Sequence, residues 1–389
     1  MPRTRRQMRA ITVIAAVGLI GIPSCVSLVS PGPEGRAVPV VRGVYKNGRD
    51  QIVRIALATA ARDVPDAGSM KGPVVVRPEA NDSLVVWNGK RYRGELVMTA
   101  TDSGVLVVNR LSMDDYLRGV VPLEIGNRTA AERAAVEAQA VAARTYAYKH
   151  LNDTRRFDMY ATVQDQVYGG VDAEKPQADS AITATRDVVV LYNGQPISTP
   201  YHSTCGGSTA AVTEVWYNQR DEPYLRPVSD RIPGSDHFYC DASPRFSWTQ
   251  SFDGPALRAV MEKYLAAYTN APKRAIGRIT DIREQGRTPS GRMAALVVQT
   301  DSGSYTLRGN DIRFVLRDPK GTILNSTYFT FARETSGGEV SSLTVNGRGY
   351  GHGIGMCQWG AIGRARAGQN YRTILETYYP GTTIGRIAG

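Results

Sequence analysis

The spacing of hydrophobic residues predicts a β-rich segment between residues 51 and 111. Short apolar runs in this segment alternate with the turn dipeptides Asn88-Gly89 and Ser103-Gly104, a pattern typical of strands joined by tight turns. The runs are Ile52-Val53-Arg54-Ile55-Ala56-Leu57, Val74-Val75-Val76, Leu84-Val85-Val86-Trp87 and Val105-Leu106-Val107-Val108.

Helical signals follow further along the chain. Thr129-Ala130-Ala131-Glu132 has the form of a capping box, and the alanine-rich stretch after it predicts a helix to about His150. Pro176 fits the first position of a second helix that ends near Thr185. A helical piece around 256–268 precedes probable strands at 294–298 and 328–331, so helices and strands are segregated and the predicted fold class is α+β.

The N-terminus has the layout of a signal peptide. Several arginines lie within the first ten residues, and an apolar run from Ile11 to Ile22 follows. This run is well short of the roughly 20 residues that a membrane-spanning helix needs, so we predict no transmembrane helix in the mature protein. Ile22-Pro23-Ser24-Cys25 resembles the lipobox of bacterial lipoproteins, which predicts a lipid on Cys25 and a membrane-anchored protein of the cell envelope. An ordinary cleaved signal, with Cys25 removed or free, is the alternative.

The composition adds a basic charge to this picture. The chain has 389 residues, 42% of them hydrophobic, which is enough for a substantial core and excludes a disordered protein. The formal net charge is +11, and removing the arginines of the signal segment leaves about +7. This excess suits a polyanionic envelope surface, although an ordinary solvated surface has it too. Nucleic-acid binding is disfavoured because the charge is spread along the chain and export removes the partner.

Glu124 is the first candidate for chemistry. It is expected on a short link just before the alanine-rich helix, with Leu123 and Ile125 on either side. Poor solvation among aliphatic residues would raise its pKa and keep it protonated as a general acid. A glutamate at a helix start would instead have its pKa lowered by the helix dipole. The local residues leave both interpretations open.

Histidine and cysteine recur with the same spacing at two places, His202–Cys205 and His237–Cys240. Together the two pairs could form a tetrahedral Cys2His2 zinc site. The alternative is a disulfide between Cys205 and Cys240, worth about 3 to 4 kcal/mol for a loop of this length. Export favours the disulfide.

Glycines occupy every second position from 347 to 355. This spacing differs from the dinucleotide-binding fingerprint and instead permits close approach of the backbone to an extended ligand. Tyr350 and His352 lie between the glycines and could meet the rings of a sugar polymer. A structural role for His352 is the alternative.

These segments, in this order, resemble the stage II sporulation protein D family, also called the SpoIID/LytB domain. The likeness covers about 54–382. The matching motifs are Tyr-Leu-x-Gly-Val-Val-Pro-x-Glu at 116–124, Ala-Gln-Ala-Val-Ala-Ala-Arg-Thr-Tyr at 138–146, Gln-Val-Tyr-Gly-Gly at 166–170, His-Ser-Thr-Cys-Gly-Gly at 202–207, Gly-His-Gly-Ile-Gly-Met-Cys-Gln at 351–358 and Tyr-Tyr-Pro-Gly-Thr at 378–382.

The resemblance implies a peptidoglycan lytic transglycosylase that acts best on glycan strands without stem peptides. Glu124 would be the catalytic acid and base, and the chemistry would need no cofactor. Some relatives carry a structural zinc near the Ser-Thr-Cys-Gly-Gly stretch, and Cys357 stands where many relatives have serine. A weakly catalytic glycan-binding scaffold that assists a cell-wall amidase is the alternative. The residues expected to contact the glycan are Gln166, Tyr168, His202, Ser203, Tyr350, His352 and Gln358.

The predicted organisation combines these observations. A signal peptide at 1–24 and a lipid anchor with a flexible tether at 25–45 precede one SpoIID/LytB-like domain at 46–389. Within this domain we expect a β-rich part at 46–112, a catalytic core at 113–249, an inserted α/β segment at 250–345 and the glycine-rich motif with a C-terminal helix at 346–389.

Overall fold

A computed structural model describes residues 27–31, 37–42, 45–64, 68, 70–80, 84–273 and 275–388. The predicted signal peptide and Cys25 lie outside these residues. Among the helices that are described, none combines the length and the apolar character needed to cross a membrane. The described chain contains both helices and separate β-sheets, which confirms the α+β fold class.

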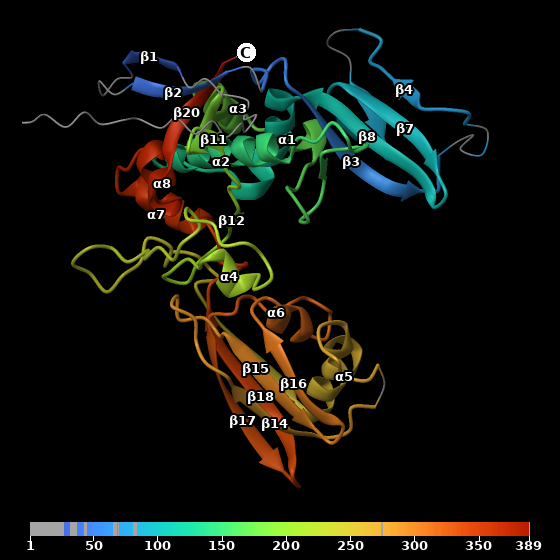
Figure 1. The fold of residues 1–389 in the computed structure, drawn as a ribbon, viewed down its shortest axis with the longest axis vertical. Helices are drawn as coiled ribbons and strands as arrows, with labels where there is room; N and C mark the ends of the chain where they lie inside the picture. The colour runs from blue at the N-terminus through green and yellow to red at the C-terminus, as the bar shows by residue number, and fades with distance from the viewer. Residues whose placement is uncertain are drawn as a thin grey trace, which may run out of the picture.

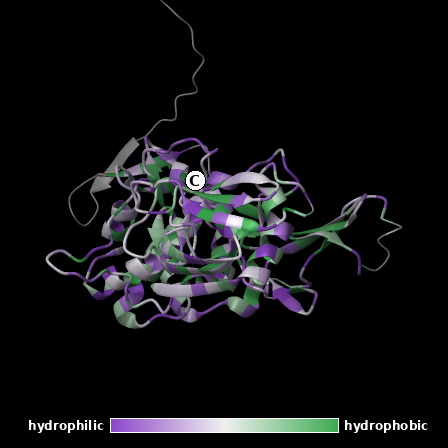
Figure 2. Cartoon of the chain, turned by 90° about the horizontal axis from the view of Figure 1, so that it is seen from below, coloured by the Kyte–Doolittle hydropathy of each residue, from purple (hydrophilic) through white to green (hydrophobic). Residues whose placement is uncertain are grey.

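The two large hydrophobic cores divide the described chain into two bodies (Figure 1), and a third, small cluster consists of Ala56, Leu106 and Val108. The first body takes its core from residues on both sides of the second, between Val41 and Cys240 and again between Ile354 and Ile387. The second body has a core of its own between Phe252 and Val345, close to the insertion expected at 250–345. Seen from the side of the second body, hydrophilic residues lie mainly on the peripheral loops (Figure 2).

A five-stranded sheet forms the β-rich part of the first body, in the order β4-β7-β8-β3-β9. A separate hairpin of β5 and β6 turns at Asn88 and Gly89, whose φ angles of 52° and 71° suit a tight hairpin turn and confirm that prediction. The strands are β3 (Ile52–Ala61), β4 (Val74–Val76), β5 (Val85–Trp87), β6 (Lys90–Tyr92), β7 (Glu95–Thr101), β8 (Gly104–Ser112) and β9 (Met159–Tyr160).

A second sheet brings the two ends of the described chain together, in the order β1-β2-β20-β10-β11. β2 pairs in parallel with β20, and Val41 of β2 is buried. The prediction of a flexible tether is therefore wrong for residues 37–42, because these residues form part of a sheet. The strands are β1 (Ser27–Pro31), β2 (Ala37–Arg42), β10 (Val188–Tyr192), β11 (Gln195–Pro196) and β20 (Thr383–Ala388).

The helix that carries Glu124 is α1 (Met113–Ile125), a segment that we expected to be a link. Ser112 caps this helix by accepting a hydrogen bond from the backbone N–H of Asp115 at 3.2 Å. Pro122 lies inside the last turn. Glu124 therefore lies in the last turn of a helix, where the helix dipole disfavours a negative charge and does not lower the pKa of the carboxyl group.

The alanine-rich helix α2 (Arg133–His150) lies at the centre of the first body. It begins after the short turn η2 (Ala130–Glu132), where the N–H of Thr129 donates to the Glu132 carboxylate at 2.8 Å, as the capping box predicts. Ala135, Ala138 and Ala142 are fully buried. These small side chains let the surrounding helices approach closely. The neighbours are α1, α3 (Pro176–Ala184), α7 (Gln358–Arg366) and α8 (Tyr371–Tyr378).

The second body consists of two antiparallel sheets and the helix α5 (Gly254–Tyr264), followed by the turn η4 (Leu265–Ala267) and the short helix α6 (Asp311–Val315). One sheet has the order β13-β18-β17 and the other the order β14-β15-β16. The strands are β13 (Ser247–Asp253), β14 (Ile279–Glu284), β15 (Ala295–Thr300), β16 (Gly303–Arg308), β17 (Phe329–Ser336) and β18 (Glu339–Arg348).

Shorter elements connect the two bodies and shape the site. A parallel pair of two-residue strands, β12 (Tyr201–His202) and β19 (Met356–Cys357), brings the histidine-rich and the glycine-rich motifs side by side. The remaining turns are η3 (Gly170–Ala173) and α4 (Val212–Val215).

Candidate functional site

The carboxyl group of Glu124 lies where three distant segments of the chain meet. The backbone N–H of Val167 donates to Glu124 Oε1 at 2.9 Å. The side chains of Tyr201 and Gln358 also hydrogen bond to this carboxyl group. Glu124 is partly exposed, so its carboxyl group is held by the protein and can still reach a ligand.

Burial raises the pKa of Glu124 above its ordinary value of 4.5, and the hydrogen bonds from Val167, Tyr201 and Gln358 offset this only in part. Of the two interpretations that the sequence left open, the structure favours the raised pKa. The source differs from the prediction, because the neighbouring side chain of Leu123 is 46% exposed. A carboxyl group with a raised pKa can serve as a proton donor closer to neutral pH.

A chain of hydrogen bonds leads from the core to Glu124. The Tyr116 hydroxyl donates to Gln166 Oε1 at 3.0 Å, and Gln166 Nε2 donates to the Tyr201 hydroxyl oxygen at 2.9 Å. Since the Tyr201 oxygen accepts from Gln166, its own proton is free to point at the Glu124 carboxyl group. Gln166 is 1% exposed. It positions Tyr201 from behind and does not contact a ligand at the surface, which corrects the predicted role.

His352 holds the backbone of Tyr201 in place. Its Nδ1 accepts from the N–H of Ile354 at 3.0 Å, so the ring proton is on Nε2, which donates to the Tyr201 carbonyl at 2.9 Å. Burial, together with the positive charge of Arg313, lowers the pKa of His352 to about 3. The ring is therefore neutral near pH 7. The contacts of His352 match a structural role, which was the alternative to contact with the glycan.

His202 and Tyr168 also face the interior, contrary to the prediction that they contact the glycan. His202 Nδ1 donates to the Ile354 carbonyl at 3.1 Å, while its Nε2 has no hydrogen-bond partner within the described residues. Burial lowers the pKa of His202 well below 6.5. The Tyr168 hydroxyl donates to Asn109 Oδ1 at 2.8 Å, inside the first core.

The remaining predicted contact residues lie closer to the surface. Ser203 and Tyr350 are partly exposed, and the Arg245 guanidinium covers the Tyr350 ring at 4.0 Å from its centre. Gln358 is largely buried and donates to Gln139 Oε1 at 3.2 Å in addition to its bond with Glu124. Gln358 thus bridges α2 and α7 beside the carboxyl group.

Two residues at this site were absent from our prediction. Tyr201 directly precedes the His-Ser-Thr-Cys motif, and only its hydrogen bond to Glu124 reveals its part in the site. Trp359 follows Gln358, is partly exposed, and lies under the Arg128 guanidinium at 5.3 Å from its ring centre. A partly exposed tryptophan one residue after Gln358 offers an aromatic face to a sugar ring.

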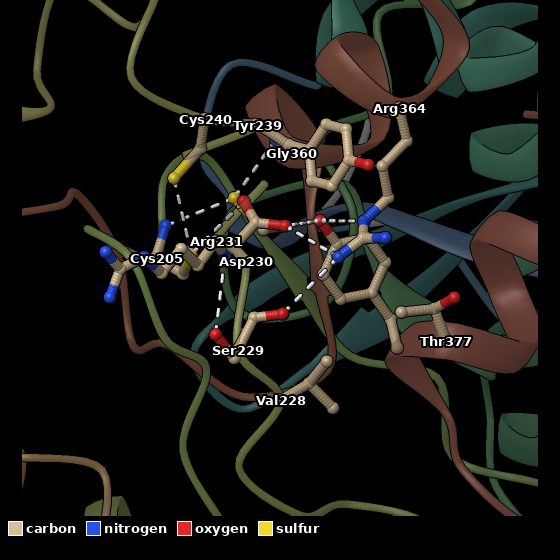
Figure 3. A network of polar contacts seen from close by, with 12 residues as sticks. Cys205, Val228, Ser229, Asp230, Arg231, Tyr239, Cys240, Gly360, Arg364 and Thr377 are labelled. Atoms are coloured by element: carbon tan, nitrogen blue, oxygen red, sulfur yellow. Dashed lines mark hydrogen bonds and ion pairs between the residues drawn. The ribbon is translucent and has the colours of Figure 1, made fainter. Parts of the chain in front are cut away.

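Three cysteines and one aspartate form a buried cluster, of which Cys205, Asp230 and Cys240 are labelled in Figure 3. The sulfurs of Cys205 and Cys240 are 3.5 Å apart, and Cys205 Sγ lies 3.6 Å from Asp230 Oδ2. Cys357 Sγ completes the cluster, and all four ligand atoms lie within 4.8 Å of one another. The three cysteines are free, which contradicts the predicted Cys205–Cys240 disulfide.

The Cys2His2 zinc site predicted from the two His-x-x-Cys pairs is wrong as well. The His237 side chain is 78% exposed and bonds to Asp241 at 3.0 Å, while His202 Nδ1 bonds to a backbone carbonyl. The two cysteines of the predicted set do meet. Their partners are Cys357 and Asp230, neither of which is part of a His-x-x-Cys pair, so the motif spacing did not indicate them.

Comparisons with known proteins agree with the motifs around Glu124. A family model described as a stage II sporulation protein matches residues 101–192, and a model described as a domain of unknown function matches residues 234–355. An uncharacterized protein of Brachyspira hyodysenteriae is 33% identical, over 82% of this chain and 78% of that protein. The amidase enhancer of Bacillus subtilis is 33% identical, over 69% of this chain and 40% of its own. Stage II sporulation protein D of Bacillus subtilis is 29% identical, over 71% of this chain and 75% of its own.

Proposed function

Because this chain belongs to the stage II sporulation protein D family, which gives it a cell-wall-related role, we propose that it is a peptidoglycan lytic transglycosylase with Glu124 as its catalytic residue. The observation that carries the proposal is the state of Glu124. Its carboxyl group is partly exposed, has a raised pKa and is held by Val167, Tyr201 and Gln358. This is the environment that a general acid requires.

In the proposed reaction, Glu124 gives its proton to the oxygen that joins N-acetylmuramic acid to N-acetylglucosamine. The bond from the anomeric carbon to that oxygen breaks while positive charge develops on the muramic ring. The 6-hydroxyl oxygen of the same ring then bonds to the anomeric carbon, and the Glu124 carboxylate takes up the hydroxyl proton. The products are a 1,6-anhydro end and a free N-acetylglucosamine hydroxyl, and Glu124 is protonated again.

The neighbours of Glu124 support both halves of this cycle. After the proton leaves, the carboxylate is stabilised by the Val167 N–H and by the side chains of Tyr201 and Gln358. The nucleophile belongs to the substrate, so one protein carboxylate is sufficient and the chemistry needs no cofactor. The hydrogen-bond chain through Gln166 keeps the Tyr201 hydroxyl in place during the reaction.

A second candidate function comes from the name of one relative. The amidase enhancer of Bacillus subtilis is 33% identical to this chain, which favours a glycan-binding protein that assists a cell-wall amidase. In that function the same surface would hold the glycan without breaking it. An amidase that strips stem peptides is a partner in either case, since it would supply the denuded strands.

We also propose that the protein is exported and held at a membrane by a lipid on Cys25, a residue outside the described part of the chain. The sequence features that support this are the arginine-rich start, the short apolar run and the Ile-Pro-Ser-Cys ending. A Cys25→Ala variant should move from the membrane fraction to the soluble fraction. Retention of this variant at the membrane would contradict the lipid anchor.

The decisive experiment is mass spectrometry of denuded glycan strands before and after incubation with the protein lacking residues 1–25. Anhydromuramic ends establish the transglycosylase, reducing muramic ends indicate hydrolysis instead, and intact strands that bind the protein indicate the scaffold. Glu124→Gln is the matched variant, because it keeps the shape and removes the transferable proton. Its cleavage rate should fall by about 10² to 10⁴-fold while strand binding is retained.

A further inference from the structure

The buried cluster of sulfurs and one carboxylate has the dimensions of a metal site. A tetrahedral zinc ion, with bonds of about 2.3 Å to sulfur and 2.0 Å to oxygen, separates two sulfurs by about 3.8 Å and a sulfur from an oxygen by about 3.5 Å. The corresponding distances here are 3.5 Å between Cys205 and Cys240 and 3.6 Å between Cys205 and Asp230. All four ligand atoms fit within one such coordination sphere.

The surroundings hold these ligands in the required orientation. Asp230 Oδ1 accepts from the Tyr378 hydroxyl at 2.7 Å and from Arg364 Nη2 at 3.2 Å, which leaves Oδ2 directed at the sulfurs (Figure 3). Cys357 Sγ accepts from two backbone N–H groups, those of Cys205 and Gly360, each at 3.2 Å. Such outer contacts orient metal ligands and favour the charged form of a thiolate.

A disulfide explains the cluster less well. Bonded sulfurs are about 2.05 Å apart, and two of these three cysteines could pair only by leaving the third thiol and Asp230 buried together. All three cysteines and Asp230 are 0% exposed. A cation that binds all four groups gives each of them a partner, which buried polar groups require.

We propose that Cys205, Asp230, Cys240 and Cys357 bind one structural zinc ion. Three sulfurs and one oxygen are donors that zinc accepts, and four protein ligands make a closed site with no position for substrate. This proposal differs from the Cys2His2 set in two of its four ligands, and it holds whether or not the protein cleaves glycan.

The position of the ion gives it a role in ordering the candidate site. Cys357 directly precedes Gln358, and β19, which contains Cys357, pairs with β12, which contains Tyr201. Both Gln358 and Tyr201 hydrogen bond to Glu124. The zinc ion therefore stabilises the strand pair that contains Tyr201 and directly precedes Gln358, from a position where it takes no part in the chemistry.

Metal analysis and cobalt substitution test the proposal on the protein lacking residues 1–25, purified under reducing conditions without chelator. We expect about one zinc per chain. Replacing this zinc by Co²⁺ should give the strong near-ultraviolet absorption of cobalt–thiolate bonds and the visible bands of a tetrahedral ion. Folded protein with all three thiols reduced that binds neither zinc nor Co²⁺ would overturn the proposal.

Variants identify the ligands. Cys357→Ser should lose stoichiometric zinc, and Asp230→Asn should retain the cobalt–thiolate absorption with weaker affinity. Tyr378→Phe keeps all four ligands but removes the hydrogen bond to Asp230, so its zinc affinity should fall by about 10 to 100-fold. His237→Ala is the matched control and should bind zinc like the unmodified protein. Full zinc binding by a folded Cys357→Ser variant, or loss of zinc in His237→Ala, would refute the ligand set.

Discussion

The two bodies of the molecule are built in different ways. In the second body, the three strands of one sheet, β14, β15 and β16, pair in the order in which they occur along the chain. In the first body, Glu124 meets Val167, Tyr201 and Gln358, which come from three other segments. Glu124, whose pKa is raised, belongs to the first body. The cluster of three cysteines and Asp230 belongs to the same body.

This difference separates a sheet whose strands are neighbours along the chain from a site that depends on distant contacts. The two bodies still share a buried connection. Arg292 of the second body donates through Nη2 to the carbonyls of Cys205 at 2.9 Å and Ser208 at 3.0 Å. The second body thereby fixes the loop that carries one of the proposed zinc ligands, and its influence on the site can be measured.

The largest effect that we expect is confined to the second body. Leu307 is 0% exposed in the second core, so Leu307→Ala should lower the free energy of unfolding of this body by about 2 to 5 kcal/mol. Hydrogen exchange should show the loss in strands β15 and β16, while amides of α2 keep their protection. Equal loss of protection in α2 would mean that the two cores unfold as one unit.

Arg292→Ala should affect both bodies at once. It removes two hydrogen bonds and leaves one buried and one partly buried carbonyl without their donor, which should cost about 2 to 4 kcal/mol. Arg278→Ala is the matched control, because Arg278 lies in the same body in an exposed, solvent-screened ion pair with Asp301, and its loss should change stability far less. Chemical denaturation measures both values, and similar costs would show that the connection is weak.

Mild acid should lower the free energy of unfolding of the first body and leave that of the second body nearly unchanged. His202 and His352 have lowered pKa values in the folded protein, so the unfolded chain binds more protons and stability is lost as the pH falls below about 6.5. Each histidine contributes a slope of about 1.4 kcal/mol per pH unit. All four histidines of the chain lie outside the second body. Hydrogen exchange at pH 7 and pH 5 should therefore show loosening around β12 and β19 with little change in β15, and the reverse pattern would contradict this assignment.

The smallest effect concerns the pH dependence of the proposed cleavage. The Tyr201 hydrogen bond lowers the pKa of Glu124, so Tyr201→Phe should raise that pKa further. The alkaline limb of the kcat profile should then move to higher pH. Tyr217→Phe, which removes a hydroxyl bonded to Asp311 at the boundary with the second body, should leave the profile unchanged. A shift of the limb to lower pH would show that Tyr201 acts differently.

The sequence predicted those features that depend on neighbours along the chain. The capping box at Thr129, the proline at the start of α3 and the Asn88-Gly89 turn are all found in the structure. Helix α1 was missed because Gly119 and Pro122 interrupt its pattern, although Ser112 and Asp115 form a capping signal at its start.

The candidate site was predicted only in part, for a related reason. Glu124 could be selected from its own neighbours and from the family motif. Tyr201 acquires its importance through its contact with Glu124, and Asp230 through its contacts with the three cysteines, none of which the motifs link to them. The buried positions of Gln166, Tyr168 and His202 likewise depend on how distant elements pack, which a motif does not report.

The alanine-rich helix α2 has a consequence for how this protein tolerates mutation. Its buried alanines face α1, α3, α7 and α8, so the packing leaves little room for a larger side chain on most sides of the helix. Each added methylene group would displace a neighbouring helix, at a typical cost of about 1 to 3 kcal/mol. The segment with the simplest composition should therefore be among the least variable under selection for a folded protein, even where it has no part in the chemistry.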